Sequence, residues 1–319
     1  MGRILIICLN SAIDQIVEIQ NWHEGSVMRS SKCSMWMSGK GFNSARALSK
    51  LKDIEVDVIA VVGSESRKFF EAEIGNNSTT FLFSTPGYSR TNITLTLPDG
   101  SLIAHIQTQG FILSSRGVIE EVLEKVRLIG SNTDIVILSG SLPQGLNKDT
   151  YEFLIRELKI QKKRVLFDSS GEELLSGLQA GPFFIKPNLE EFEFLLGRKV
   201  HAEDLQSVAS DLRSLKRLDA QYIALTLGKD GLLFYDVRAD KIYYGNLILE
   251  SEYKSVNEIG CGDSFMAGFA YGLARNKSVL KAVESGIRFG AANLFADGPG
   301  EINLSSITDE TRFEWRSLA

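Results

Sequence analysis

This chain has little cysteine or histidine and no excess of positive charge, and each lack excludes a class of protein. Its 319 residues include three cysteines and three histidines, and neither type has the spacing of a zinc site. Cys8, Cys33 and Cys261 are odd in number and far apart, which favours thiols in a reducing compartment over a disulfide framework. The formal net charge of -5 provides no basic surface, so we expect no nucleic-acid partner.

Long apolar runs are lacking as well. The first apolar stretch, residues 3–9, is too short for a signal peptide or a membrane span and fits a buried first strand. No other stretch approaches the length of an uninterrupted span. We therefore expect a cytoplasmic protein with no membrane partner.

What the sequence does contain is an alternation of apolar, β-rich runs with helix-like stretches. We predict strands at 3–9, 56–63, 134–140, 164–170, 183–188 and 222–228, and helices near 41–51, 65–75, 115–129, 148–160 and 201–217. Continuous apolar strands separated by helices indicate an α/β fold with a mostly parallel central sheet flanked by helices. The ligand site is then expected beyond the carboxyl ends of the strands.

A second pattern interrupts this alternation. Residues 13–20 and 32–38 alternate apolar and polar side chains, and residues 91–108 indicate two strands joined at Pro98, Asp99 and Gly100. We predict a small antiparallel β lid, with strands from about 11–38 and 88–110, whose free face is available for a homodimer contact. The last residues, 307–319, are predicted to form a short surface helix.

Familiar nucleotide motifs are absent. In "SGKGFN" a glycine follows Lys40 where a P-loop needs Ser or Thr, and the partial glycine pattern "GCGDSF" lies near residue 260 rather than after the first strand. This "GCGD" turn allows two interpretations for Asp263. It is a plain helix cap, or it stands beside a phosphate that backbone N–H groups at the helix N-terminus bind.

Seven segments together favour the second interpretation. In chain order they are "CLNSAIDQIVEI", "SGKGFNSARALSKL", "SGSLPQGLNKDTY", "FDSSGEELL", "FIKPNLEEFEFLLG", "LTLGKDGLL" and "NEIGCGDSFMAGFAYGL". From about residue 4 to residue 300, this series resembles the ribokinase-like (PfkB) carbohydrate kinases, in the branch of 1-phosphofructokinase and tagatose-6-phosphate kinase. The resemblance implies a ribokinase-like fold and a single kinase domain over residues 1–319.

The resemblance also implies catalytic roles for the "GCGD" turn. Gly260, Cys261 and Gly262 match the turn that holds the transferring phosphoryl group, and Asp263 matches the catalytic base. Phosphoryl transfer depends more on positioning and charge neutralisation than on a strong base, so an ordinary carboxylate suffices.

On the sugar side, the resemblance assigns substrate contacts to the lid, to the "GKGxN" loop and to the end of a strand. These residues are Asp14, Arg29, Gly39, Lys40, Asn43, Arg90 and Ser139. Arg90 matches an arginine that binds the phosphate already on the sugar, a task that its planar fork suits. The ordinary alternatives are a turn aspartate at position 14 and surface charges at positions 40 and 90.

On the nucleotide side, the resemblance assigns contacts with ATP to Lys186, Asn188, Thr226, Gly228, Gly231 and Asn293. It assigns Glu191 to Mg²⁺ through water, and magnesium commonly keeps several waters. As an alternative or in addition, Asn188 and Glu191 form a capping box, and residues 226–231 form a hairpin turn.

We therefore expect ATP-dependent phosphorylation of a ketohexose phosphate. Fructose 1-phosphate, giving fructose 1,6-bisphosphate, is preferred because Gly110-Phe111 resembles the form in some 1-phosphofructokinases. Residues 139–151 look at least as close to tagatose-6-phosphate kinase, so tagatose 6-phosphate stays an alternative. A non-catalytic sugar-phosphate sensor is a further alternative. Its basis is a set of departures from the family pattern: Met28, Ser38, Glu258 and Cys261.

Overall fold

A ten-stranded sheet forms the body of the protein. The computed structural model describes residues 2–72, 74–113, 117–248, 259–303, 305 and 312–318. The strands of this sheet are β1 (Gly2–Cys8), β4 (Ile54–Gly63), β5 (Ser78–Thr85), β8 (Ile135–Ser139), β9 (Arg164–Asp168), β10 (Phe184–Ile185), β11 (Tyr222–Thr226), β12 (Leu232–Asp236), β13 (Lys241–Ile248) and β14 (Arg312–Leu318). Their order is β14-β13-β12-β11-β10-β9-β8-β1-β4-β5. The strands from β5 to β11 pair in parallel, and β12, β13 and β14 pair antiparallel.

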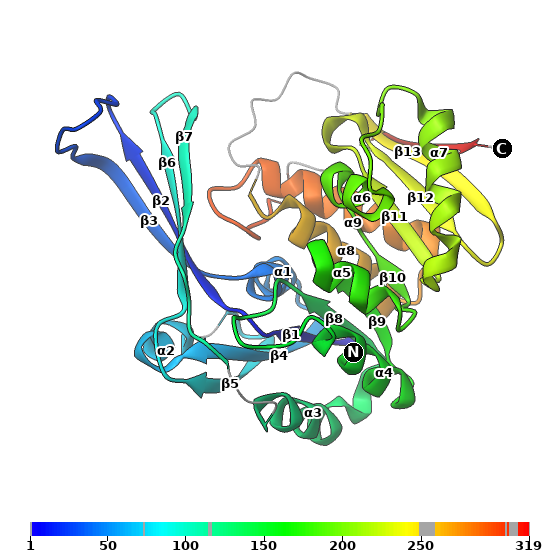
Figure 1. Ribbon diagram of the computed structural model, residues 1–319, viewed down its shortest axis with the longest axis horizontal. Coiled ribbons are helices and arrows are strands. Elements are labelled where there is room, and N and C mark those ends of the chain that lie inside the picture. The colour runs from blue at the N-terminus through cyan, green and yellow to red at the C-terminus, as the bar shows by residue number, and fades with distance from the viewer. Residues whose placement is uncertain are drawn as a thin grey trace.

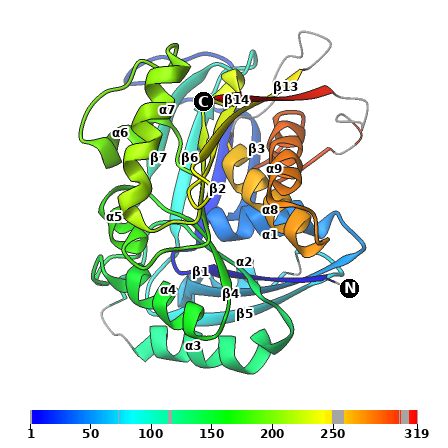
Figure 2. The same cartoon turned by 90° about the vertical axis from the view of Figure 1, so that its right-hand side faces the viewer.

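Helices cover both faces of this sheet. They are α1 (Lys40–Ser49), α2 (Arg67–Phe70), α3 (Gly117–Ile129), α4 (Thr150–Ile160), α5 (Gly171–Leu178), α6 (Leu189–Leu196), α7 (Leu205–Ser214), α8 (Cys261–Ala274) and α9 (Val279–Leu294). Figure 2 shows α3 to α7 on one face and α1, α8 and α9 on the other. The predicted α/β architecture with a mostly parallel sheet is confirmed.

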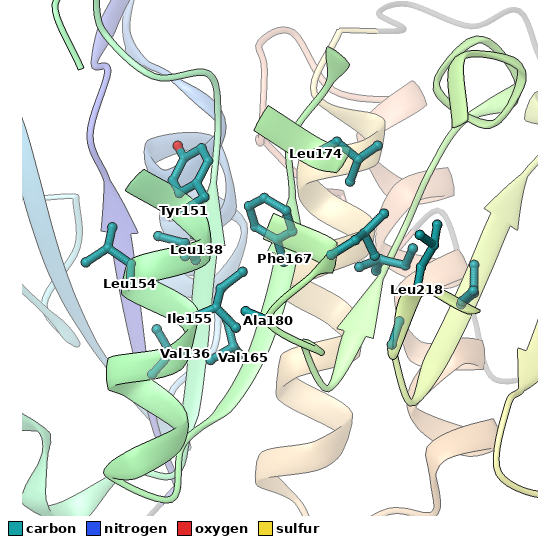
Figure 3. Packing of buried hydrophobic residues seen from close by; sticks show 14 of the residues in the cluster. Val136, Leu138, Tyr151, Leu154, Ile155, Val165, Phe167, Leu174, Ala180 and Leu218 are labelled. Carbon is teal, nitrogen blue, oxygen red and sulfur yellow. The ribbon is translucent and has the colours of Figure 1, made fainter. Parts of the chain in front are cut away.

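The alternation of side chains along each strand explains why the strands read as continuous apolar runs. In β1, Ile4 and Ile6 face the core under α1 and α8, whereas Leu5 and Ile7 face the core under α3 and α4. Figure 3 shows the second core, where α4 packs its apolar side chains over β8 and β9. Both faces of the strand are therefore buried, and the strand ends are left to carry polar chemistry.

Helices α8 and α9 pack unusually closely because α8 has glycines on the shared face. A methyl group at Gly268 would lie 2.5 Å from the backbone oxygen of Ser285 in α9. Glycine at this position therefore allows the two helices to approach closely, and the contact fixes the helix that carries Asp263.

Four strands form a separate sheet, which we call the lid. They are β2 (Ala12–Ile19), β3 (Ser30–Ser38), β6 (Arg90–Thr96) and β7 (Leu102–Gln107), in the order β3-β2-β6-β7. Both hairpins are antiparallel, but β2 and β6 pair in parallel, so the sheet is mixed rather than wholly antiparallel. In Figure 1 the lid projects from the body as a blue and cyan ribbon.

Two predicted helices differ from the structure. Residues 312–318 are predicted as part of a surface helix, but they form strand β14 because they pair with β13. The other residues of that predicted helix, 307–311 and 319, lie outside the described residues. The helix predicted near 65–75 is limited to the 3₁₀ turn at Ser64–Ser66 and the short α2. Within the described part of the chain, every helix is too short or too polar to span a bilayer.

Candidate active site

The site lies where the parallel strands end, as predicted. Ser139 ends β8, Asp168 ends β9, Lys186 follows β10 and Thr226 ends β11. Since these strands are neighbours in the sheet, their polar ends meet along one edge. The lid and the N-terminus of α8 bring the remaining groups to this edge.

Lysines and carboxylates alternate at the centre of this edge. Lys40 Nζ donates to Asp168 Oδ1 at 3.1 Å and lies 3.8 Å from Glu191 Oε1. Lys186 Nζ lies 3.9 Å from Asp168 Oδ2, and both of these side chains are buried. Burial alone would lower the pKa of Lys40, but the charges of Asp168, Glu191 and Asp263 outweigh it and raise this pKa. Lys40 therefore stays charged, and its ammonium lies with Asp168 and Glu191 rather than with Asp14.

The "GCGD" turn opens helix α8 with backbone geometry that only glycine adopts easily. Gly260 has a φ of 88°, and a methyl group there would lie 2.6 Å from the backbone nitrogen of Gly300. At Gly262 a methyl group would lie 3.1 Å from Lys186 Nζ, so glycine lets this ammonium approach the turn. The N–H groups of the first turn of α8, including that of Cys261, are thus next to a lysine, an arrangement suited to an anion.

Asp263 lies in the first turn of α8 and is 8% exposed. Burial raises the pKa of its carboxyl from 3.8 to about 7, and the negative charge of Asp168 adds to the rise. Lys40 and Lys186 and a hydrogen bond from Asn43 act in the opposite direction. A carboxyl that titrates near neutrality can both accept and release a proton.

A chain of side chains within hydrogen-bond distance of one another runs from the lid to Asp263. Asn92 Nδ2 donates to Asp14 Oδ1 at 2.6 Å, and Ser38 Oγ lies 2.6 Å from Asp14 Oδ2. Ser38 Oγ also lies 3.1 Å from Asn43 Oδ1, and Asn43 Nδ2 donates to Asp263 Oδ2 at 2.8 Å. Three lid strands and two helices are thereby connected through five side chains.

Some polar atoms at this edge have no hydrogen-bond partner among the described residues. They include Ser139 Oγ, Arg90 Nε and Asn92 Oδ1, all of which are buried. Buried polar groups without partners are costly, so these atoms suit a polar ligand that supplies the missing bonds.

The predicted nucleotide side starts with a helix cap. Asn188 Oδ1 accepts from the Glu191 backbone nitrogen at 2.8 Å, and Glu191 Oε2 accepts from the Asn188 nitrogen at 2.9 Å, which makes the expected capping box. Thr226 bridges to Asn188, and Gly228 and Gly231 bound the turn between β11 and β12, so the expected hairpin turn is present.

The fit of a magnesium ion depends on two nearby carboxylates, Glu191 and Asp168. Burial raises the pKa of Glu191, and Asp168 adds to the rise, so a cation would relieve this repulsion. Within the described ranges there is no group of three or more His, Cys, Asp or Glu side chains with metal-ligand spacing. The two nearby carboxylates, Asp168 and Glu191, are oxygen ligands of the kind that magnesium prefers, so the residues present fit this ion.

Comparison with known proteins identifies the family. The model of the pfkB family of carbohydrate kinases matches residues 3–305. The chain belongs to this family. Like its relatives, it is a phosphotransferase that acts on a carbohydrate.

The similar proteins are sugar-phosphate kinases. The chain is 29% identical over 298 residues to 1-phosphofructokinase of Bacillus subtilis, covering 93% of this chain and 94% of that protein. It is 30% identical over 316 residues to tagatose-6-phosphate kinase of Staphylococcus epidermidis, covering 96% of each.

Solved structures show the same fold. Phosphofructokinase-2 from Escherichia coli in complex with potassium has a TM-score of 0.83 at 24% identity, over 96% of this chain and 97% of that chain. The tetrameric inhibited form of phosphofructokinase-2 from Escherichia coli has a TM-score of 0.78 at 25% identity, over 92% of this chain and 94% of that chain.

Two residues predicted from the resemblance to this pfkB family do not join the site. Arg29 is exposed and directly precedes β3, and Ser38 is at the other end of this strand. Nine strand residues span roughly 30 Å, so Arg29 lies about that far from Ser38. Asn293 is fully buried in α9, where Oδ1 accepts from Ser264 Oγ and the Gly300 nitrogen. Its amide is therefore used to fasten the start of α8, which contradicts a contact with adenine.

Other residues of this pfkB kinase were missed by the sequence reasoning. Asp168 was noted only within a polar strand end, Asn92 only within a strand, and Ser38 only as a departure from the family pattern. The signal that would have found Asp168 is its position after an apolar parallel strand, beside two lysines that need a counter-charge. Glu258, another departure, lies outside the described residues.

Proposed function

We propose that this pfkB kinase transfers the γ-phosphoryl group of ATP to a ketohexose phosphate, and that fructose 1-phosphate is the acceptor. The observation that carries the proposal is the position of Asp263. It is a buried carboxyl at the N-terminus of a helix, beside two lysines and joined by hydrogen bonds to Asp14. General-base chemistry and stabilisation of phosphoryl charge are thus available at one point.

In this proposal the sugar lies between the lid and the body. Asp14 and Ser139 bind sugar hydroxyls. Gly39 and Asn43 bring the backbone at the start of α1 close to the sugar. Arg90 binds the phosphate that the sugar already carries, and its buried Nε, which has no partner among the described residues, supports this role.

The nucleotide lies on the opposite side of Asp263. Its phosphates are surrounded by residues after β10 and in the turn between β11 and β12: Lys186, Asn188, Thr226, Gly228 and Gly231. A magnesium ion, when bound, neutralises charge on the phosphate oxygens. Glu191 would hold it through water.

The proposed reaction is a direct transfer. Asp263 accepts the proton of the acceptor hydroxyl as the sugar oxygen forms its bond to the γ-phosphorus. The bond from that phosphorus to the β–γ bridging oxygen breaks, and ADP leaves. The N–H groups of Gly260, Cys261 and Gly262 and the ammonium of Lys186 stabilise the charge on the transferring group.

Tagatose 6-phosphate is the second candidate acceptor. It is favoured by the relative from Staphylococcus epidermidis, which is as similar to this chain as the 1-phosphofructokinase from Bacillus subtilis. Both acceptors carry a phosphate and several hydroxyls, so Arg90 and Asp14 suit either of them.

Coupled measurement of ADP release tests the proposal. Mg·ATP is supplied with fructose 1-phosphate, tagatose 6-phosphate, fructose 6-phosphate, fructose or ribose. We expect turnover on fructose 1-phosphate and a loss of about 10²- to 10⁴-fold in kcat for Asp263→Ala. Glu124→Ala, which removes an exposed carboxylate on α3, serves as the control. No turnover on any phosphosugar, with retained binding of one of them, would instead favour the sensor.

We also propose that two copies associate through the lid. Cross-strand register places Asp14, Trp36 and Asn92 on one face and Met35, Ile93 and Ile106 on the other. On that second face Met35 is 51% exposed and Ile106 is 48% exposed, and exposed apolar side chains of this kind are disfavoured by water. The tetrameric form of the phosphofructokinase-2 relative supports a second copy as the occupant.

Two neighbouring substitutions on β7 distinguish the faces. Ile106→Asp should shift the mass measured by light scattering from dimer to monomer, whereas His105→Asp, on the opposite face, should leave the dimer intact. A monomeric wild-type protein at micromolar concentration would contradict the association.

We propose that residues 1–319 act as one kinase domain and that the lid strands are part of it. We propose a cytoplasmic location because ATP and phosphosugars are intracellular substrates. In keeping with this, none of the three cysteines, all of which are among the described residues, is disulfide-bonded.

A further inference from the structure

Ser38 occupies the junction between the lid and the body. It is the last residue of β3, and Gly39 separates it from the first residue of α1. The side chain is 1% exposed, so water does not compete for its hydroxyl. A group at this junction contacts both the lid and the helix that carries Asn43.

The Ser38 hydroxyl has two acceptors for one proton. Its Oγ lies 2.6 Å from Asp14 Oδ2 and 3.1 Å from Asn43 Oδ1, and a serine donates only one hydrogen bond at a time. Without substrate the shorter contact with the charged carboxylate is favoured. A sugar hydroxyl that donates to Asp14 Oδ2 shares the charge of that oxygen with Ser38, which weakens the contact between Ser38 and Asp14 and favours the alternative in which the Ser38 proton turns towards Asn43 Oδ1.

This turn changes the hydrogen bond that Asn43 makes with Asp263. Arg46 Nη1 already donates to Asn43 Oδ1 at 3.3 Å, and Ser38 adds a second, shorter hydrogen bond to this oxygen. An amide whose oxygen accepts a further hydrogen bond is more strongly polarised, and its N–H groups become better donors. Asn43 Nδ2 already donates to Asp263 Oδ2 at 2.8 Å, so a stronger donor fixes the carboxylate more firmly in position.

We propose that Ser38 is a positioning residue that couples occupancy of Asp14 by the sugar to the orientation of Asp263, through Asn43. The inference rests on the proposed kinase function and assigns Ser38 no contact with the reacting atoms. Its consequence is that the base is best oriented only when the acceptor sugar is present.

Kinetics of three variants test this coupling. Ser38→Ala removes the hydroxyl and should lower kcat on the phosphosugar about 5- to 10-fold while leaving the KM for ATP unchanged. Ser38→Thr keeps a hydroxyl and should recover most of kcat. In the double variant with Asp14→Asn and Ser38→Ala, the fold-loss of kcat should be about fivefold smaller than the product of the two single fold-losses. This is expected because both residues act through one chain of hydrogen bonds.

Controls separate this inference from folding and from the proposed function. Ser285→Ala removes a buried hydroxyl of α9 that hydrogen-bonds to Lys281 and Lys277, and it should leave kcat unchanged. Melting temperatures of all variants show whether each one folds.

Each outcome of these measurements supports or overturns a specific proposal. Wild-type kcat in Ser38→Ala, or purely multiplicative effects with Asp14→Asn, would overturn the coupling while turnover and its loss in Asp263→Ala still support the kinase. An equal loss of kcat in Ser285→Ala would also overturn it. Absence of wild-type turnover would overturn both proposals.

Discussion

Neutralising Asp263 should stabilise the protein as it removes activity. The carboxyl has a pKa of about 7 in the folded chain against 3.8 as its ordinary value, a difference of about 3 units. The folded state therefore binds more protons than the unfolded state between about pH 4 and 7, and stability falls as pH rises through this window. At about 1.4 kcal/mol per unit, the ionised form costs about 4 kcal/mol at pH 7 and above.

Asp263→Asn removes this cost and still offers an oxygen to Asn43. Its advantage over the wild type should grow from under 1 kcal/mol near pH 4 to about 4 kcal/mol at pH 7. For a chain of 319 residues this corresponds to a rise in melting temperature of roughly 6 °C.

Calorimetric melting of both proteins from pH 4 to pH 8 measures the difference, and ADP release confirms the loss of turnover. Glu124→Gln, the same change at an exposed position on α3, should show no pH-dependent gain. Equal melting temperatures of wild type and Asp263→Asn at pH 7.5 would refute the argument that burial raises the pKa of this carboxyl.

Three further predictions concern activity and packing. The pH profile of kcat/KM should rise through about pH 7 as Asp263 ionises, and Lys40→Met should move this limb to higher pH because Lys40 lowers the pKa of Asp263; an unmoved limb would exclude that electrostatic contribution. Arg90→Lys should raise the KM for the phosphosugar about tenfold and leave that for ATP unchanged, since lysine lacks the planar fork. Gly268→Ala should lower the unfolding free energy by about 1–3 kcal/mol in urea, because its methyl group would meet the backbone oxygen of Ser285.

Local patterns were sufficient for the elements whose evidence is local. The buried strand β1 is a continuous apolar run, and the hairpin of β6 and β7 is marked by its turn at residues 98–100. The capping box of Asn188 and Glu191 is likewise visible in four consecutive residues. Each of these features involves neighbours in the chain, so spacing alone predicts it.

Features that depend on distant partners were missed or misassigned. Residues 312–318 become a strand only because β13 offers an edge about 70 residues earlier. Asn293 resembles a nucleotide contact until its bonds to Ser264 and Gly300 are seen. The sequence marks Ser38 only as a departure from a glycine motif, and its role depends on Asp14, which lies diagonally from it on the neighbouring strand β2. No local pattern carries this information.

The link between Asn43 and Asp263 also sets an order of events during synthesis. The two residues are 220 positions apart, so at 5–20 residues per second the second follows the first by about 11 to 44 s. Asn43 and Ser44 are buried and bond to Asp263 in the finished protein, so α1 cannot dock on the sheet with its polar groups satisfied until α8 has been made. A nascent chain that ends before Asp263 therefore holds no assembled base, and it would not consume ATP.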